Sequence, residues 1–117
     1  MIPAMPRYVI LRHDWPAPHL DLLVEAGEVL KAWRLPPEPP PGEWVPAAPN
    51  ADHRRLYLEY EGPVAGDRGS VVRWLAGEWG DGVVEFRGDG WCRVNPLPWA
   101  PARQTTPPAR SETPTPR

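Results

Sequence analysis

The chain has 117 residues, which is enough for one domain with a hydrophobic core but too few for two. Residues 1–99 carry ten Lys and Arg against fourteen Asp and Glu, which excludes the broad basic surface of proteins that hold long stretches of nucleic acid. The single cysteine, Cys92, excludes an internal disulfide, and neither a leader nor a long apolar run is present, so we expect a cytoplasmic protein without membrane contact.

Short β-branched or alternating segments separated by turn signals follow one another along the chain. The segments predicted to be strands are 7–12, 19–25, 29–35, 55–61, 70–75, 83–87 and 91–94. The sequence AGE predicts a turn between the second and third, and GDG at 88–90 favours a tight hairpin turn before the last. This spacing predicts an all-β fold, a small antiparallel β-barrel of about six to eight strands.

The prolines gather in two places. Residues 36–49 hold seven of them and predict a long internal loop, partly in polyproline II conformation. Residues 100–117 hold five, with no aromatic residue, and cannot bury enough apolar surface to offset the entropy of ordering. We therefore expect a barrel domain at 1–99 and a disordered tail at 100–117.

Two of the three histidines lie in the stretch RHDWPAPHLDLL. Residues two apart on a strand share a face, so His19 and Asp21 project together. His13 ends the preceding strand, and the proline-containing segment after it can fold it back beside them. Two imidazoles and one carboxylate make a candidate metal site with open coordination positions. We expect Asp14 to cap its own loop instead.

Two motifs carry a resemblance to a known family. The order RYVI, HD, HLDL and LKAW, followed by DHRRLYLEYEG and VVRW, resembles the 3′-phosphoesterase module of bacterial DNA ligase D over most of the chain except the tail. The spacing of the family's motifs is retained for His13, His19 and Asp21, and for His53 and Tyr57. The resemblance implies a standalone, divergent barrel that removes a 3′-ribonucleoside and then a 3′-phosphate from DNA ends.

The resemblance also implies a role for each motif residue. His13, His19 and Asp21 would bind a divalent ion, Mn²⁺ first, with Zn²⁺ or Co²⁺ as alternatives. Such an ion would polarise a phosphoryl oxygen and activate water. His53 would donate a proton or a hydrogen bond to the transferring phosphate, and Tyr57 would orient that histidine or the phosphate.

Three positions depart from the family pattern. Leu23 stands where the family has arginine, Pro37 falls near its lysine, and Ala51 replaces an acidic residue. In the family, the arginine and the lysine at these positions would bind phosphate oxygens. Restoring the arginine with Leu23→Arg is therefore expected to raise the rate of phosphate release about tenfold. The arginines expected to supply this charge from another direction are Arg12, Arg54 and Arg55.

The expected function is a metal-dependent phosphoesterase that removes a 3′-phosphate or 3′-ribonucleotide from DNA or RNA ends, or acts on a smaller phosphoester. Its expected partners are such ends and a ligase or another repair protein. The alternative is a noncatalytic metal-bearing barrel that binds an end or a repair partner. An iron oxygenase also uses two histidines and a carboxylate, but the second motif argues against it.

Overall fold

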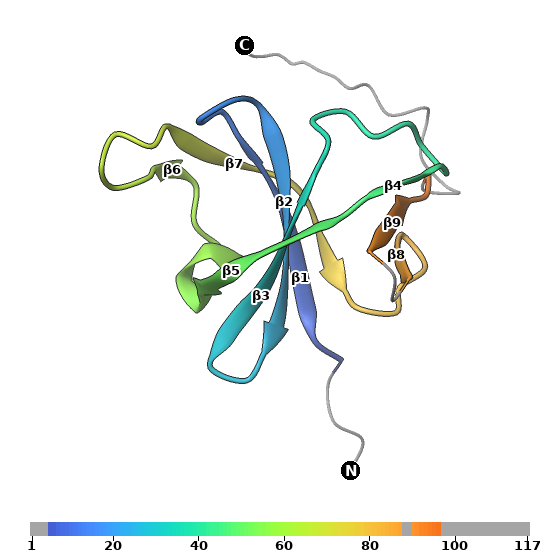
Figure 1. Ribbon diagram of the computed structural model, residues 1–117. Coiled ribbons are helices and arrows are strands. Elements are labelled where there is room, and N and C mark those ends of the chain that lie inside the picture. Colours follow the sequence, from blue (N-terminus) through green and yellow to red (C-terminus); the bar gives the residue numbers. More distant parts are fainter. Residues whose placement is uncertain (1–4, 88–89, 97–117) are drawn as a thin grey trace.

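The computed structural model describes residues 5–87 and 90–96, so the predicted tail and the first two residues of the GDG turn lie outside the described residues. The strands are β1 (Arg7–His13), β2 (His19–Ala26), β3 (Val29–Leu35), β4 (Trp44–Pro46), β5 (Ala48–Arg54), β6 (Gly62–Pro63), β7 (Ser70–Glu78), β8 (Val84–Arg87) and β9 (Trp91–Val94) (Figure 1). A short 3₁₀ helix, η1, spans Arg55–Leu58. Within the described part of the chain, no helix has the length and apolar character needed to cross a membrane.

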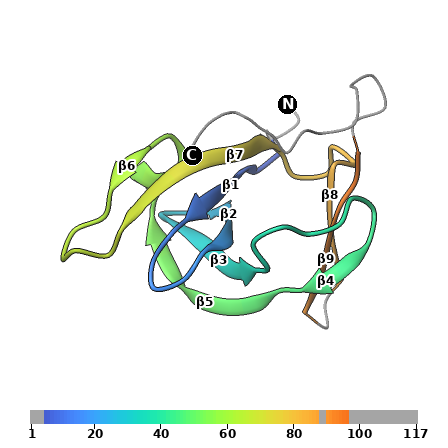
Figure 2. The ribbon, with the colours of Figure 1, turned by 90° about the horizontal axis from the view of Figure 1, so that it is seen from above.

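The strands form two antiparallel sheets. The larger has six strands in the order β5-β3-β2-β1-β7-β6, and the smaller has three in the order β4-β9-β8. Figure 2 shows β5 and β7 on opposite sides of β1, β2 and β3, so the larger sheet curves into half a barrel, with β4, β8 and β9 gathered on one side. The predicted all-β, antiparallel, barrel-like fold is confirmed.

Both faces of the larger sheet are covered. Alternation along β2 sends Leu20, Leu22 and Val24 to one face, where they pack against buried side chains of the smaller sheet. Leu23 points to the other face, into a second cluster that Leu58 of η1 helps to close. The candidate metal ligands lie on the same face, at the end of the β1–β2 hairpin next to this second cluster, and therefore lie beside a packed core.

The predicted strand at 55–61 is wrong. β5 pairs with β3 as far as Arg54, opposite Val29, where β3 begins, so the chain has no further ladder partner in that direction. It turns instead into η1, which buries Leu58 and leaves Leu56 43% exposed. Alternating hydrophobicity alone did not distinguish a strand from this turn.

The prediction of one continuous loop at 36–49 is also wrong in its second half. β4 begins at Trp44 and β5 at Ala48, so Pro46 and Pro49 lie within strands. Both strands are at the edge of their sheets. A proline is tolerated there because its missing N–H can face away from the ladder.

The remaining predicted strands are confirmed, with small shifts at their ends. β7 continues beyond the predicted 70–75 as far as Glu78. β8 and β9 form the predicted hairpin, with Arg87 opposite Trp91. Gly90, the last residue of the GDG turn, has a φ of 94°, a conformation that glycine adopts without a steric penalty.

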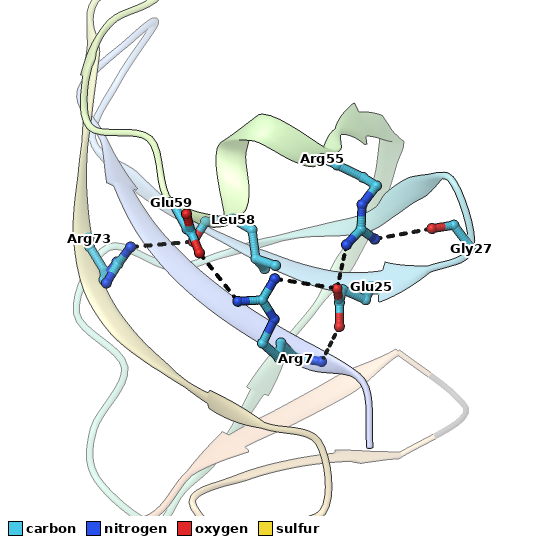
Figure 3. Close-up of polar contacts among 7 residues, drawn as sticks. All are labelled: Arg7, Glu25, Gly27, Arg55, Leu58, Glu59 and Arg73. Carbon is cyan, nitrogen blue, oxygen red and sulfur yellow. Dashed lines mark hydrogen bonds and ion pairs between the residues drawn. The ribbon is translucent and has the colours of Figure 1, made fainter. Parts of the chain in front are cut away.

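A network of charged side chains holds η1 against β1 and β2 (Figure 3). The Glu25 carboxylate accepts a hydrogen bond from the Arg7 backbone N–H at 2.7 Å and pairs with the Arg55 guanidinium at 2.6 Å. Arg55 also donates to the Gly27 carbonyl at 3.1 Å, and the Arg7 guanidinium reaches Glu59 at 3.3 Å. Arg55 is therefore directed toward the β2–β3 turn.

Glu25→Gln is expected to lower the melting temperature by a few degrees at pH 7. Hydrogen bonds from the Arg7 backbone N–H and then from Arg55 hold the pKa of the Glu25 carboxyl below its usual 4.5. A lowered pKa stabilises the fold above the usual value, and this contribution is lost as the pH falls through the folded-state pKa. The side chain is 20% exposed, so the effect is modest.

Thermal melting of wild type and Glu25→Gln across the pH range checks this expectation. The difference in melting temperature should shrink as the pH is lowered below about 4. Glu28→Gln, a change at an exposed glutamate in the β2–β3 turn, is the control and should have little effect at any pH. A Glu25→Gln difference that stayed constant from neutral to acidic pH would contradict the assigned cause.

Candidate metal centre and its pocket

His13, His19 and Asp21 lie together at one end of the β1–β2 hairpin. Antiparallel pairing puts His13 opposite His19 and Leu11 opposite Asp21, so these side chains share one face of the sheet. The two imidazole rings have centroids 4.9 Å apart. His19 and Asp21 are 5% and 4% exposed. The structure thus brings together the three side chains that the sequence singled out.

Backbone carbonyls determine which nitrogen of each imidazole faces the carboxylate. His13 Nε2 lies 2.7 Å from the Arg68 carbonyl oxygen, and His19 Nδ1 lies 2.8 Å from that of Ala17. A carbonyl only accepts, so each of these nitrogens carries a proton and donates it. In a neutral ring the other nitrogen then has a free lone pair. Metal-ligating histidines are held in this way, with the second nitrogen donating to a carbonyl or carboxylate.

The two remaining nitrogens face the Asp21 carboxylate. His13 Nδ1 lies 3.4 Å from Oδ2, and His19 Nε2 lies 3.3 Å from Oδ1. Among the described residues, neither His19 Nε2 nor Asp21 Oδ1 has a hydrogen-bond partner, although both atoms are buried. With neutral imidazoles, acceptor atoms face one another with no proton between them, which costs free energy in a buried site. A proton on one imidazole or a bound cation removes that cost.

The donor set fits a metal ion. The three ligand atoms lie within 4.8 Å of one another. Ligands about 2.1 Å from an ion, at octahedral to tetrahedral angles, are roughly 3.0 to 3.4 Å apart, and each imidazole nitrogen lies at about that distance from one of the two Asp21 oxygens. Imidazole nitrogens suit transition metals and zinc, and three protein ligands leave positions open for water or substrate. His13, His19 and Asp21 can therefore hold a metal ion.

Asp14 has a structural role outside this cluster. Its Oδ1 accepts a hydrogen bond from the Ser70 backbone N–H at 2.8 Å. Its own backbone N–H donates to the Ser70 carbonyl at 3.4 Å. Asp14 therefore ties the loop after β1 to the start of β7, rather than capping only its own loop as predicted.

A pocket of about 440 Å³ lies over this end of the sheet. His13 and Asp21 line it, together with His53 from β5 and Tyr57 from η1. The Ala51 carbonyl accepts a hydrogen bond from His53 Nδ1 at 2.9 Å, which leaves Nε2 available to a ligand. The Tyr57 ring packs edge-on against His53, with centroids 5.7 Å apart. The predicted catalytic pair thus shares a pocket with the candidate metal ligands, although Tyr57 comes from a 3₁₀ helix and not a strand.

The three arginines predicted to bind phosphate are placed differently from one another. Arg54 lines the pocket. Arg12 precedes His13 on β1, so strand alternation directs it to the opposite face of the sheet. Arg55 is held by Glu25 and by the β2–β3 turn (Figure 3).

Two other arginines line the pocket, and the sequence reasoning missed both. Arg34 on β3 lies directly opposite Asp21. The β2–β3 turn and strict alternation were a signal for it, because together they set this register. Arg68 comes from the loop between β6 and β7, and its Nε donates to the Ala65 carbonyl at 2.8 Å. No local pattern indicates where that loop folds.

Cys92 takes no part in this site. It is fully buried in the cluster between the two sheets. Burial raises the pKa of its thiol to about 11, so it stays protonated at neutral pH. A buried, protonated thiol is a poor nucleophile and a poor metal ligand.

No protein-family profile matches this chain, and no curated protein is significantly similar to it. The chemistry of the site follows from its own side chains, a cluster of two imidazoles and a carboxylate beside a pocket that a further histidine and three arginines line.

Proposed function

We propose that this protein is a divalent-metal-dependent phosphoesterase that removes a phosphate or a ribonucleotide from the 3′ ends of nucleic acids, with Mn²⁺ as the first candidate ion. The shared pocket carries the proposal, because two of the candidate metal ligands, His53 and three arginines line it. Phosphoryl transfer requires mainly positioning and charge neutralisation, which these groups supply. The resemblance of the two motifs to the 3′-phosphoesterase module of DNA ligase D supports the same reaction.

Three side chains would hold the ion. Bound to His13, His19 and Asp21, a divalent ion would polarise a phosphoryl oxygen and lower the pKa of a bound water. The carbonyls of Arg68 and Ala17 hold both imidazoles in the orientation that ligation needs. Each ring is thus already oriented with one nitrogen toward Asp21.

His53 would act on the phosphate directly. With Nδ1 bonded to the Ala51 carbonyl, Nε2 is the atom through which a protonated ring donates to a phosphate oxygen or to the leaving oxygen. Tyr57 packs against the ring and restricts its rotation. The arginines of the pocket neutralise the charge of the phosphate.

The test is phosphate release from a DNA primer with a 3′-phosphate, with Mn²⁺ or with EDTA. We expect release with Mn²⁺ only, and a rate at least about 100-fold lower in His53→Ala. Leu56→Ala, at an exposed neighbour of Tyr57 on η1, is the control and should keep the wild-type rate. If the metal bound but neither a 3′-phosphate nor a 3′-ribonucleotide were released, the protein would instead be a metal-bearing barrel that does not catalyse this reaction.

A further inference from the structure

We propose that Trp15, Arg34 and Arg68 form a binding site for one terminal nucleotide, in which the two arginines hold its phosphate and Trp15 stacks on its base. The inference rests on the proposed function and names its substrate class. The ligand is the 3′-phosphorylated terminal nucleotide of a strand, and a phosphoester without a base lacks one of the two contacts.

The two guanidinium groups are available to an anion. Within the described residues, neither Arg34 nor Arg68 forms an ion pair with a carboxylate. The Arg68 Nε is engaged with the Ala65 carbonyl, which leaves its two terminal nitrogens for a ligand. Arginine binds phosphate through parallel N–H groups, and two exposed arginines in one concave pocket attract a dianion.

The pocket is lined by fewer carboxylates than guanidinium groups, and one of the carboxylates is paired with a lysine. Asp52 pairs with the Lys31 ammonium at 3.3 Å. Asp21 lies against the two imidazoles and is the other carboxylate in the lining. Arg54 adds a third guanidinium to the lining. The charge of the pocket therefore favours a phosphate over a neutral end.

Arg68 connects the phosphate site to the metal ligands. Its backbone carbonyl accepts the hydrogen bond from His13 Nε2, while its side chain lines the pocket. The loop that carries it is anchored at Gly69, whose φ is 72° and where a Cβ would lie 2.1 Å from Asp14 Oδ1. Only glycine fits there, and the close approach sets the position of Arg68 relative to His13.

Trp15 supplies a surface for the base. It is 44% exposed and lines the pocket, unlike most of the apolar side chains near it, which are packed. A Cβ at Gly69 would lie 2.7 Å from Trp15 Cβ, so the tryptophan sits directly beside the loop of Arg68. An exposed indole next to a phosphate site stacks on any of the four bases, because every base has a π-face.

The overall charge limits the contact to the end of a strand. Residues 1–99 have four more acidic than basic side chains, so a long backbone finds no continuous basic track. The arginines of the pocket are a local exception. Such a pocket can bind the phosphate and the base of one terminal nucleotide.

The experiment is fluorescence anisotropy in EDTA, where turnover does not occur, with a short 5′-labelled single-stranded DNA that ends in a 3′-phosphate or a 3′-hydroxyl. Wild type should bind the 3′-phosphate strand about tenfold more tightly. Arg34→Gln and Arg68→Gln should each reduce this preference to about twofold or less. Arg34→Lys, which keeps the positive charge, should retain part of the preference. Arg12→Gln, on the opposite face of the sheet, is the charge-matched control and should retain the preference.

Trp15→Ala should weaken binding of both strands about tenfold and leave the affinity for inorganic phosphate unchanged. All these side chains are exposed, so the variants should melt like wild type. A wild type without preference for the 3′-phosphate, or a preference that survives both glutamine variants, would overturn the phosphate assignment. Unchanged strand affinity in Trp15→Ala would overturn the base contact. If the binding results were as expected but no phosphate were released with Mn²⁺, only the proposed catalysis would be rejected, and the binding site would stand.

Discussion

Asp21→Asn is expected to abolish divalent-metal binding while the protein stays folded. Asparagine keeps the shape of the side chain but removes the negative charge with which Asp21 would bind a divalent ion. In the neutral protein the change also removes a buried acceptor that has no hydrogen-bond partner among the described residues. Isothermal calorimetry with Mn²⁺, Zn²⁺ and Co²⁺ measures the loss directly. His13→Ala and His19→Ala should lose binding as well.

Metal binding should also stabilise the wild-type fold. Metal at 100 times its dissociation constant contributes about 2.7 kcal/mol, which corresponds to a rise in melting temperature of roughly 10 to 20 °C for a domain of this size. Imidazoles ligate only when neutral, so the rise should diminish as the pH is lowered toward about 6. Asp21→Asn should show no rise at any pH.

Asp52→Asn is the matched control for this experiment. Asp52 lines the same pocket and pairs with Lys31, but it lies outside the cluster of three ligands. It should keep wild-type metal affinity and the full rise in melting temperature. Unchanged calorimetric affinity in Asp21→Asn would show that the ion binds elsewhere and would remove the basis of the proposed reaction.

Leu23→Arg should destabilise the protein by about 3 to 5 kcal/mol, the cost of an uncompensated buried charge. From the sequence alone, this substitution was expected to raise the rate, because Leu23 shares the face of His19 and Asp21. The structure indicates a loss of stability, since Leu23 is 0% exposed and lies between Val9 and Ala32 on the neighbouring strands. Such a loss is a large part of the total stability of a small domain.

Chemical denaturation of Leu23→Arg measures the effect, with Leu23→Met as the control for side-chain size. The methionine variant conserves volume and polarity and should lose less than about 1.5 kcal/mol. A Leu23→Arg protein as stable as wild type would show that its guanidinium reaches water or the pocket. Phosphate release by that stable variant would then reveal whether the arginine helps the reaction.

Local patterns in the sequence were enough to predict much of the candidate metal centre. Period-two alternation determines which side chains share a face within one strand, so His19 and Asp21 were paired correctly before any fold was known. The short strands and their turn residues likewise predicted the all-β class. These properties depend on residues close together in the chain, and a single sequence contains that information.

Contacts between distant segments determined where η1 forms and which arginines line the pocket. Residues 55–58 became η1 because β3 offers β5 no partner beyond Arg54. Arg34 reaches the pocket through its register with Asp21, and Arg68 through the fold of a loop, whereas Arg55 is held elsewhere by Glu25. Local spacing indicates the face of a strand on which a side chain lies. Which other segments cover that face depends on contacts between residues far apart in the chain.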